Sequence, residues 1–215
     1  MNLAASALRR DDSGVSLVEV TLSVALLGLL LAAIGFTFAS VNNTFLDTVE
    51  RQANLSEAQV IMDNVSKDLR TATRIEASGS PFVQAEDFDV IFYANLHPSE
   101  GPRHVRLYVN GDNELEIRIK EPDSGSAPNF TYSGPNTTRV LGSNLANTSS
   151  EPLFTYLDAD SNELSTPLDS SGRAQVRSVT LNVHVAEPDT PDVPGSHLTN
   201  TVRLPNTHYE NLDES

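Results

Sequence analysis

The chain has 215 residues, enough for one compact domain of ordinary size and one additional element. It contains no cysteine, which excludes disulfide bonds, thiolate metal sites and cysteine nucleophiles. Its 29 acidic residues outnumber its 14 lysines and arginines, for a net charge of -15, so we expect its surface to repel phosphates and to bind no nucleic acid directly.

The first predicted element is a long apolar helix near the N-terminus. No charged residue occurs between Val20 and Leu46, and about 20 apolar residues are enough to cross a bilayer. Arg9 and Arg10 precede this segment, which favours a cytoplasmic N-terminus. We therefore expect a single-pass protein of the cytoplasmic (inner) membrane with an extracytoplasmic head.

A short polar leader meets this helix at residues 13–19, Ser-Gly-Val-Ser-Leu-Val-Glu. Glu19 is the single carboxylate in the apolar start of the helix. An ionised side chain near the centre of a bilayer costs about 2.5 to 3.5 kcal/mol on insertion scales. A position near the membrane edge lowers this cost, but the carboxylate still favours a positively charged partner.

The junction resembles the class III signal of type IV prepilins and type II secretion pseudopilins. In those families a prepilin peptidase cuts after the glycine, usually methylates the new amine, and leaves a glutamate at the fifth mature position. The resemblance implies a leader at residues 1–14, cleavage between Gly14 and Val15, and Glu19 as the assembly residue. Val15 stands where these families usually have phenylalanine or methionine. The implied partners are other pilin or pseudopilin subunits, the prepilin peptidase and an inner-membrane assembly platform.

Cleavage would create an ammonium group at Val15, one helical turn from the carboxylate of Glu19. In the filaments of these families, this carboxylate is thought to meet the amine of a neighbouring subunit. Such a pair in an apolar bundle sets the axial register, because a shifted register leaves both charges unpaired.

The helix is predicted to continue past the apolar segment, because no proline occurs between Val15 and Pro81. We predict a helix over about residues 15–75, with a transmembrane and assembly segment at 15–40 and an amphipathic segment within 41–78. Apolar residues of the second segment recur mostly every three or four positions and predict one buried face: Leu46, Val49, Ala53, Ala58, Ile61, Val65, Leu69 and Ala72.

Gly28 and Gly35 lie in the assembly segment. Glycine lowers helix propensity in water, but inside a helical bundle it permits close approach of neighbouring helices. We interpret both glycines as helix-packing positions.

The head, residues 79–204, shows the two-residue period of β-strands. Residues 110–113, Asn-Gly-Asp-Asn, predict a hairpin turn between two such strands. Loops are predicted at 121–135 and 188–194, and a flexible acidic tail at 205–215. Strands are predicted near residues 88–94, 105–109, 115–119, 138–141, 152–157, 176–185 and 199–204. The predicted class is α+β, with one antiparallel β-sheet head packed on the long N-terminal helix, as in the pilin fold.

Further segments are similar to the J-class minor pseudopilins and W-class minor pilins. The helix end around Lys-Asp-Leu-Arg-Thr-Ala, residues 67–72, carries part of this likeness. The segments at 154–158, 177–185 and 201–206 carry the rest. This likeness implies a minor subunit at the tip of a filament, or one that initiates it, at the cell surface or in the periplasm.

An acidic segment resembles a calcium-binding loop only in part, through Asp158, Asp160, Asn162 and Asp169. The sixth position is Glu163 instead of glycine, and the last is aspartate instead of glutamate, so an acidic hairpin loop is the preferred interpretation. The five histidines show no metal-ligand spacing, and we interpret them as surface residues: His97, His104, His184, His197 and His208. We expect no metal and no cofactor.

No catalytic set is visible, so an enzyme is not expected. Within the same family, the alternative is a type II secretion or competence pseudopilus subunit that moves protein or DNA. Outside the family, one alternative is a signal-anchored extracytoplasmic binding or adhesion domain that never polymerises. An anchored hydrolase is a further alternative.

Overall fold

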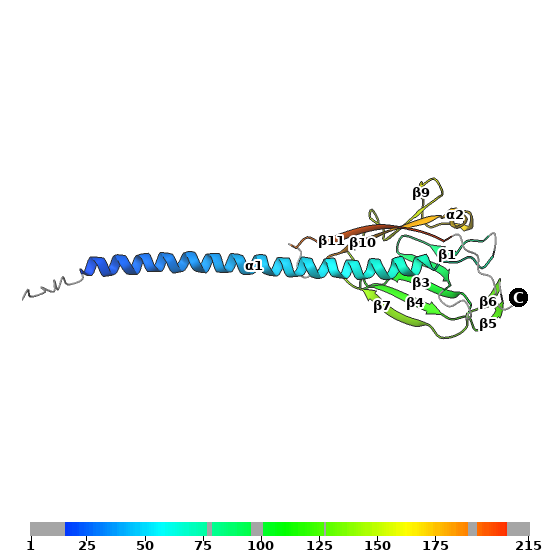
Figure 1. Ribbon diagram of the computed structural model, residues 1–215, viewed down its shortest axis with the longest axis horizontal. Helices are drawn as coiled ribbons and strands as arrows, with labels where there is room; N and C mark the ends of the chain where they lie inside the picture. Colours follow the sequence, from blue (N-terminus) through cyan, green and yellow to red (C-terminus); the bar gives the residue numbers. More distant parts are fainter. Residues whose placement is uncertain (1–15, 77–78, 96–100, 127, 189–192, 206–215) are drawn as a thin grey trace, which may run out of the picture. The chain divides into compact units, whose positions relative to one another are not determined.

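The computed structural model describes residues 16–76, 79–95, 101–126, 128–188 and 193–205. These residues form a long N-terminal helix followed by antiparallel β-sheets and a short second helix, which confirms the α+β class (Figure 1). The chain divides into two compact units, one ending at Asp47 and the other beginning at Thr48. The first helix, α1, therefore contributes residues to both units.

Helix α1 spans Leu17–Arg70 and ends short of its predicted length. Its last turn tightens, because the N–H of Thr71 donates to the carbonyl of Asp68 at 3.0 Å. The chain then pairs with a strand, and the N–H of Thr73 donates to the carbonyl of Tyr93 at 2.8 Å. This pairing with a distant strand replaces further helical hydrogen bonds, so helical periodicity and the absence of proline, which predicted a helix to about residue 75, did not mark its end.

The buried face of α1 lies in the second unit and confirms the predicted spacing only in part. Its fully buried side chains are Ala58, Ile61, Val65 and Leu69; Ala72 is also buried but lies beyond the helix end. The earlier part of the predicted face is wrong, because Leu46, Val49 and Ala53 are exposed. Burial begins at Asn54, which is 5% exposed. Helical spacing shows which side of a helix is apolar, but not where along the helix its cover begins.

The largest sheet has five antiparallel strands in the order β1–β2–β3–β4–β7. Its buried rows run across the strands, as from Val90 through Leu107 to Ile117. Residues 110–113 form the predicted turn between β3 and β4, with Asn113 in the left-handed conformation at φ 59°. The strands are β1 (Phe82–Ala85), β2 (Asp89–Ala94), β3 (Arg103–Val109), β4 (Leu115–Lys120) and β7 (Thr137–Gly142).

A second sheet of four strands has the order β11–β10–β8–β9, so the prediction of a single sheet is wrong. Strand order depends on pairing between distant segments, which periodicity does not encode. β11 is longer than predicted and begins at Ser196 instead of residue 199. The strands are β8 (Phe154–Leu157), β9 (Glu163–Leu164), β10 (Ser178–Val185) and β11 (Ser196–Arg203).

Two smaller elements were not expected. Within the predicted loop 121–135, β5 (Ser124–Ser126) pairs with β6 (Asn129–Thr131) to form a two-stranded sheet. The short helix α2 (Ser170–Gln175) is capped by Asp169, whose carboxylate accepts a 2.7 Å hydrogen bond from the N–H of Gly172.

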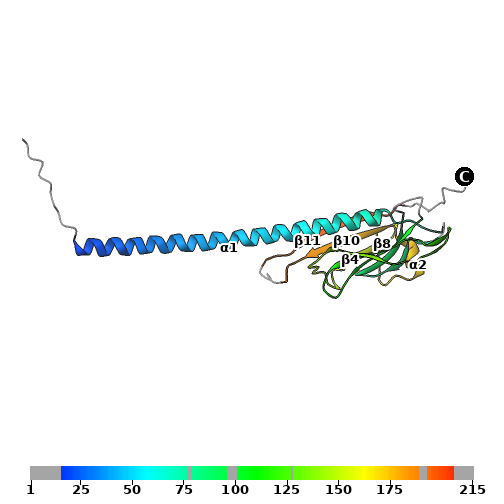
Figure 2. The same ribbon diagram turned by 90° about the horizontal axis from the view of Figure 1, so that it is seen from below.

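Side chains of the two larger sheets and of α1 between Ala58 and Leu69 share one hydrophobic core. Figure 2 shows the end of α1 running along these sheets. Tyr156 of β8 is among its largest fully buried side chains. The ring of Tyr156 packs edge-on at 5.8 Å from that of Phe82 in β1, and its hydroxyl donates to the carbonyl of Glu86 at 3.0 Å. Burial raises the pKa of Tyr156 well above its usual value, so this hydroxyl stays protonated and links the two sheets.

Candidate functional site

The strongest candidate for a functional surface is the apolar part of α1 in the first unit, residues 17–47. None of the side chains in its most apolar stretch is buried, and Phe36 and Phe38 are 80% and 75% exposed. Apolar surface in contact with water costs about 25 cal/mol per Å². A continuous exposed apolar surface therefore requires cover by lipid or by other helices. Within the described chain, α1 is the helix that is long and apolar enough to cross a membrane.

Glu19 lies in the first turn of α1. The carbonyl of Ser16 accepts hydrogen bonds from the N–H groups of Glu19 and Val20, at 2.9 and 3.1 Å, and this starts the helix. The Glu19 side chain is exposed, and its carboxylate has no hydrogen bond or ion pair with another described residue. A carboxylate in the first turn is favoured by the helix dipole. Gly14 and Val15, the predicted cleavage site, lie outside the described residues.

Gly28 and Gly35 lie two helical turns apart on one side of α1. A Cβ atom built at either position meets no other atom within 4 Å, so both sites are open on the outside of the helix. The structure thus places them on a surface where another helix has room to approach closely.

A row of small residues runs along the same side of α1 and was missed from sequence. It comprises Ala25, Gly28, Ala32, Gly35 and Ala39, all exposed. The spacings alternate between three and four positions, which keeps the row on one face of a helix. The alternation is visible in the sequence, although only Gly28 and Gly35 were predicted as packing positions.

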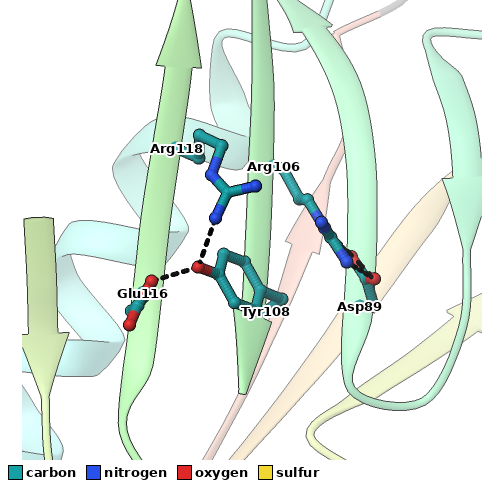
Figure 3. Close-up of polar contacts among 5 residues, drawn as sticks. All are labelled: Asp89, Arg106, Tyr108, Glu116 and Arg118. Atoms are coloured by element: carbon teal, nitrogen blue, oxygen red, sulfur yellow. Dashed lines mark hydrogen bonds and ion pairs between the residues drawn. The ribbon is translucent and has the colours of Figure 1, made fainter. Parts of the chain in front are cut away.

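The outer face of the five-stranded sheet carries a polar network that spans three strands (Figure 3). Arg106 of β3 forms a two-pronged ion pair with Asp89 of β2, at 2.9 Å from Nε to Oδ1 and 2.5 Å from Nη2 to Oδ2. Arg118 of β4 donates to the hydroxyl of Tyr108 at 2.8 Å, and that hydroxyl donates to Glu116. The network joins neighbouring strands and balances charge locally.

The pKa values in this network follow its hydrogen bonds. The bond to Glu116 raises the pKa of Tyr108 and lowers that of Glu116. The hydrogen bond to Asp89 raises the pKa of Arg106. Each shift favours the form that makes these hydrogen bonds, namely protonated Tyr108 and Arg106 and ionised Glu116. The hydrogen bonds therefore stabilise the sheet surface and hold the protons where they are.

Two hollows on the head are lined partly by charged residues. One has a volume of about 320 Å³ and includes Glu76 and Arg173 in its lining. The other has a volume of about 460 Å³ and includes Asp158, Arg177 and Arg203. Both mix acidic with basic groups, and Arg177 already donates to two backbone carbonyls.

The residues of the partial calcium motif form hydrogen bonds in two different local structures, a turn and a helix cap. Asp158 accepts hydrogen bonds from the N–H groups of Asp160 and Asn162, at 2.9 and 2.8 Å, and closes its own turn. The hydrogen bond from the side chain of Asn162 is the main reason that the pKa of Asp158 is lowered. Asp169 instead caps α2. Within the described residues, no three His, Cys, Asp or Glu side chains are grouped so that they could hold a metal ion.

Three of the five histidines lie within the described residues. His104 is half-buried between the rings of Tyr93 and Tyr132, and burial lowers its pKa. His184 and His197 are brought together as direct partners across β10 and β11. Their sequence separation gives no metal-ligand signal, and the predicted strand began after His197, so this pairing was missed. His97 and His208 lie outside the described part of the chain.

No family model, no curated protein and no solved structure matches this chain.

Proposed function

We propose that this chain is a pilin-like subunit, processed after Gly14 and assembled through the helix that follows into a type IV pilus-like filament. The observation that carries this proposal is the single carboxylate, Glu19, at the start of an exposed apolar helix, directly after a leader that ends in glycine. The α+β organisation is compatible with a pilin fold. The likeness of residues 67–72 and the later segments to minor subunits favours a role at the tip or in initiation.

The apolar part of α1 supports two successive environments. In the precursor it lies in the cytoplasmic membrane, with the head on the extracytoplasmic side. On assembly it moves from lipid into a bundle of similar helices, which are equally apolar. The exposed leucine and phenylalanine side chains are thus covered in both states, so the transfer has no large hydrophobic cost.

Glu19 supplies what apolar contacts lack, namely a single correct register. Cleavage after Gly14 creates an amine at Val15, and the carboxylate of Glu19 pairs with the amine of a neighbouring subunit. A subunit docked out of register leaves both groups unpaired in an apolar environment, which is unfavourable by several kcal/mol. The exposed carboxylate of Glu19, without a partner among the described residues, is consistent with this intermolecular role.

The small-residue row on α1 supports the same assembly. Small side chains let two helix backbones approach closely and gain van der Waals contact, which drives association where the hydrophobic effect is absent. Gly28 and Gly35 are the smallest members of the row and have open space beside them.

The test is N-terminal sequencing and intact mass of the mature protein, from cells with and without their prepilin peptidase. A peptidase-dependent N-terminus at Val15 supports the pilin pathway. An uncut Met1, or cleavage at another position, overturns the proposal and favours a membrane-anchored binding domain that does not polymerise.

A further inference from the structure

The outer face of the β10–β11 pair carries rungs of facing polar side chains. The two strands pair over their whole lengths and lie side by side in Figures 1 and 2. The hydroxyls of Thr180 and Thr201 are 2.9 Å apart, and the hydroxyl of Thr199 donates to Asn182 at 3.1 Å. Each of these rungs is closed by a hydrogen bond between its own two side chains.

The next pair of facing side chains is His184 and His197, and no hydrogen bond joins these two. Their ring centroids are 5.9 Å apart, with an angle of 59° between the planes. Within the described residues, neither imidazole has a hydrogen-bond or ion-pair partner. His197 is exposed and His184 is half-buried, so both rings reach solvent. Two adjacent imidazoles without protein partners form a set of nitrogen donors that an external ligand can use.

The backbone holds this rung in place. The N–H of His184 donates to the side chain of Asn147 at 3.1 Å, and its carbonyl accepts from Ala146 at 2.8 Å. A Cβ atom at position 195 would lie 2.8 Å from Nε2 of His184, so Gly195 leaves the edge of that ring uncovered by a side chain. Both features favour a preorganised site, because little conformational entropy of His184 is lost when a ligand binds.

The spacing of the two rings is close to that of imidazoles on one metal ion. Zinc-bound histidine nitrogens lie about 2.0–2.1 Å from the metal, and at a tetrahedral angle the ring centres are roughly 5 Å apart. The observed distance between the ring centroids is 5.9 Å. A small rotation of the exposed His197 ring is enough to bring the two rings to the spacing of metal-bound imidazoles. The net charge of -15 also raises the local concentration of cations.

We propose that His184 and His197 form a two-histidine chelate for a divalent transition-metal ion of the zinc, nickel or copper type. Neutral imidazole is a preferred ligand for these ions, and water completes the coordination. A metal ion bound by both histidines cross-links the end of β10 to the start of β11. Bound metal therefore stabilises this edge of the second sheet.

The test uses the full chain in detergent micelles, titrated with NiCl₂ and separately with ZnCl₂. The expected result is one site per chain, with simultaneous shifts of the imidazole nitrogen resonances of His184 and His197. His184→Gln and His197→Gln should each weaken binding about tenfold or more, because one remaining imidazole has no chelate partner. Zinc should raise the Tm of the unmodified chain and leave the Tm of both variants unchanged.

His104→Gln is the matched control, because it removes a half-buried histidine from the other large sheet, and it should bind as the unmodified chain does. The metal-free Tm of each variant shows whether its fold is intact. Binding that survives both single substitutions, or that shifts other histidine resonances instead, overturns the proposal. So does the absence of binding at millimolar metal.

Discussion

Glu57 of α1 accepts two hydrogen bonds from Ser143, the residue that follows β7. The backbone N–H and the hydroxyl of Ser143 lie 2.6 Å and 2.8 Å from the same carboxylate oxygen, Oε1. The contact ties the end of an edge strand of the larger sheet to the helix, close to the point where burial of α1 begins.

Replacing Glu57 by alanine is expected to lower the free energy of unfolding of the head by about 1–3 kcal/mol, because two donors lose a charged acceptor. Urea unfolding of the full chain in detergent, followed by the near-ultraviolet circular dichroism of the tyrosines, measures this loss. Asp63→Ala removes an exposed carboxylate from the same helix and should change the value by no more than about 0.5 kcal/mol. An equal loss in both variants would contradict the anchoring role of Glu57.

Gly142 allows β7 to lie against the helix. A Cβ atom at this position would lie 2.3 Å from Cγ1 of Ile61, a fully buried side chain. Gly142→Ala is therefore expected to destabilise the head by about 1–3 kcal/mol. In an Ile61→Ala background, which opens the space, the added cost should be clearly smaller.

A double-mutant cycle by urea unfolding measures this coupling between positions 142 and 61. Ile61→Ala alone is expected to cost about 2–5 kcal/mol, whereas Val60→Ala, at a neighbouring position that is 50% exposed, should cost far less. Additive effects at positions 61 and 142 would show that the two side chains do not compete for the same space.

Asp68 makes the stability depend on pH. Burial raises the pKa of its carboxyl group above the ordinary 3.8, although Arg139 and Lys67 oppose the shift. Its Oδ2 atom is buried without a hydrogen-bond partner within the described chain. The folded chain binds this proton more tightly than the unfolded chain, so this group lowers the free energy of unfolding as the pH rises above 3.8.

Asp68→Asn removes this titration. Relative to the unmodified chain, the variant should gain stability between about pH 3 and pH 7, as measured by urea unfolding over a pH series. Asp63→Asn, an exposed site on the same helix, should follow the unmodified chain. A relative stability of the Asp68 variant that falls with rising pH would reverse the assigned sign.

Glu19→Ala tests the role proposed for the carboxylate in assembly. The variant should insert into the membrane and fold normally, and its incorporation into filaments should fall by roughly tenfold or more, because the register pair is lost. Quantitative blotting of sheared filaments against total membrane protein measures the ratio. Thr37→Ala, at an exposed polar position on the same apolar segment, is the control and should assemble normally. Unchanged recovery of the Glu19 variant would remove the pairing argument.

Local patterns in the sequence predicted those elements whose period is strong. The spacing of Ala58, Ile61, Val65 and Leu69 correctly marked the buried side of α1, and alternation correctly marked β10. The Asn-Gly-Asp-Asn turn at 110–113 was also confirmed. In each case neighbouring residues carry the information, because helical and strand periods are properties of a short segment.

The predictions that were wrong concern features that depend on contacts between distant segments. The helix ends at Arg70, and Thr73 beyond it pairs with Tyr93. The strands divide into separate sheets through pairing between distant segments. The short β5–β6 pair and α2 are too brief to show a period. None of these outcomes depends on a residue's immediate neighbours alone.

The sequence by itself determined the apolar, singly charged helix and the α+β class. Composition and period suffice for these two features, since they follow from residue types and their spacing along the chain. The roles of Gly14, Val15 and Glu19 are implied by the resemblance of the junction to a prepilin signal, and they stay predictions. The tertiary structure alone decided where burial of α1 begins, how the strands are ordered, and that His184 faces His197. Those outcomes depend on which distant surfaces pack with the lowest free energy, and that balance is settled only when the whole head has folded.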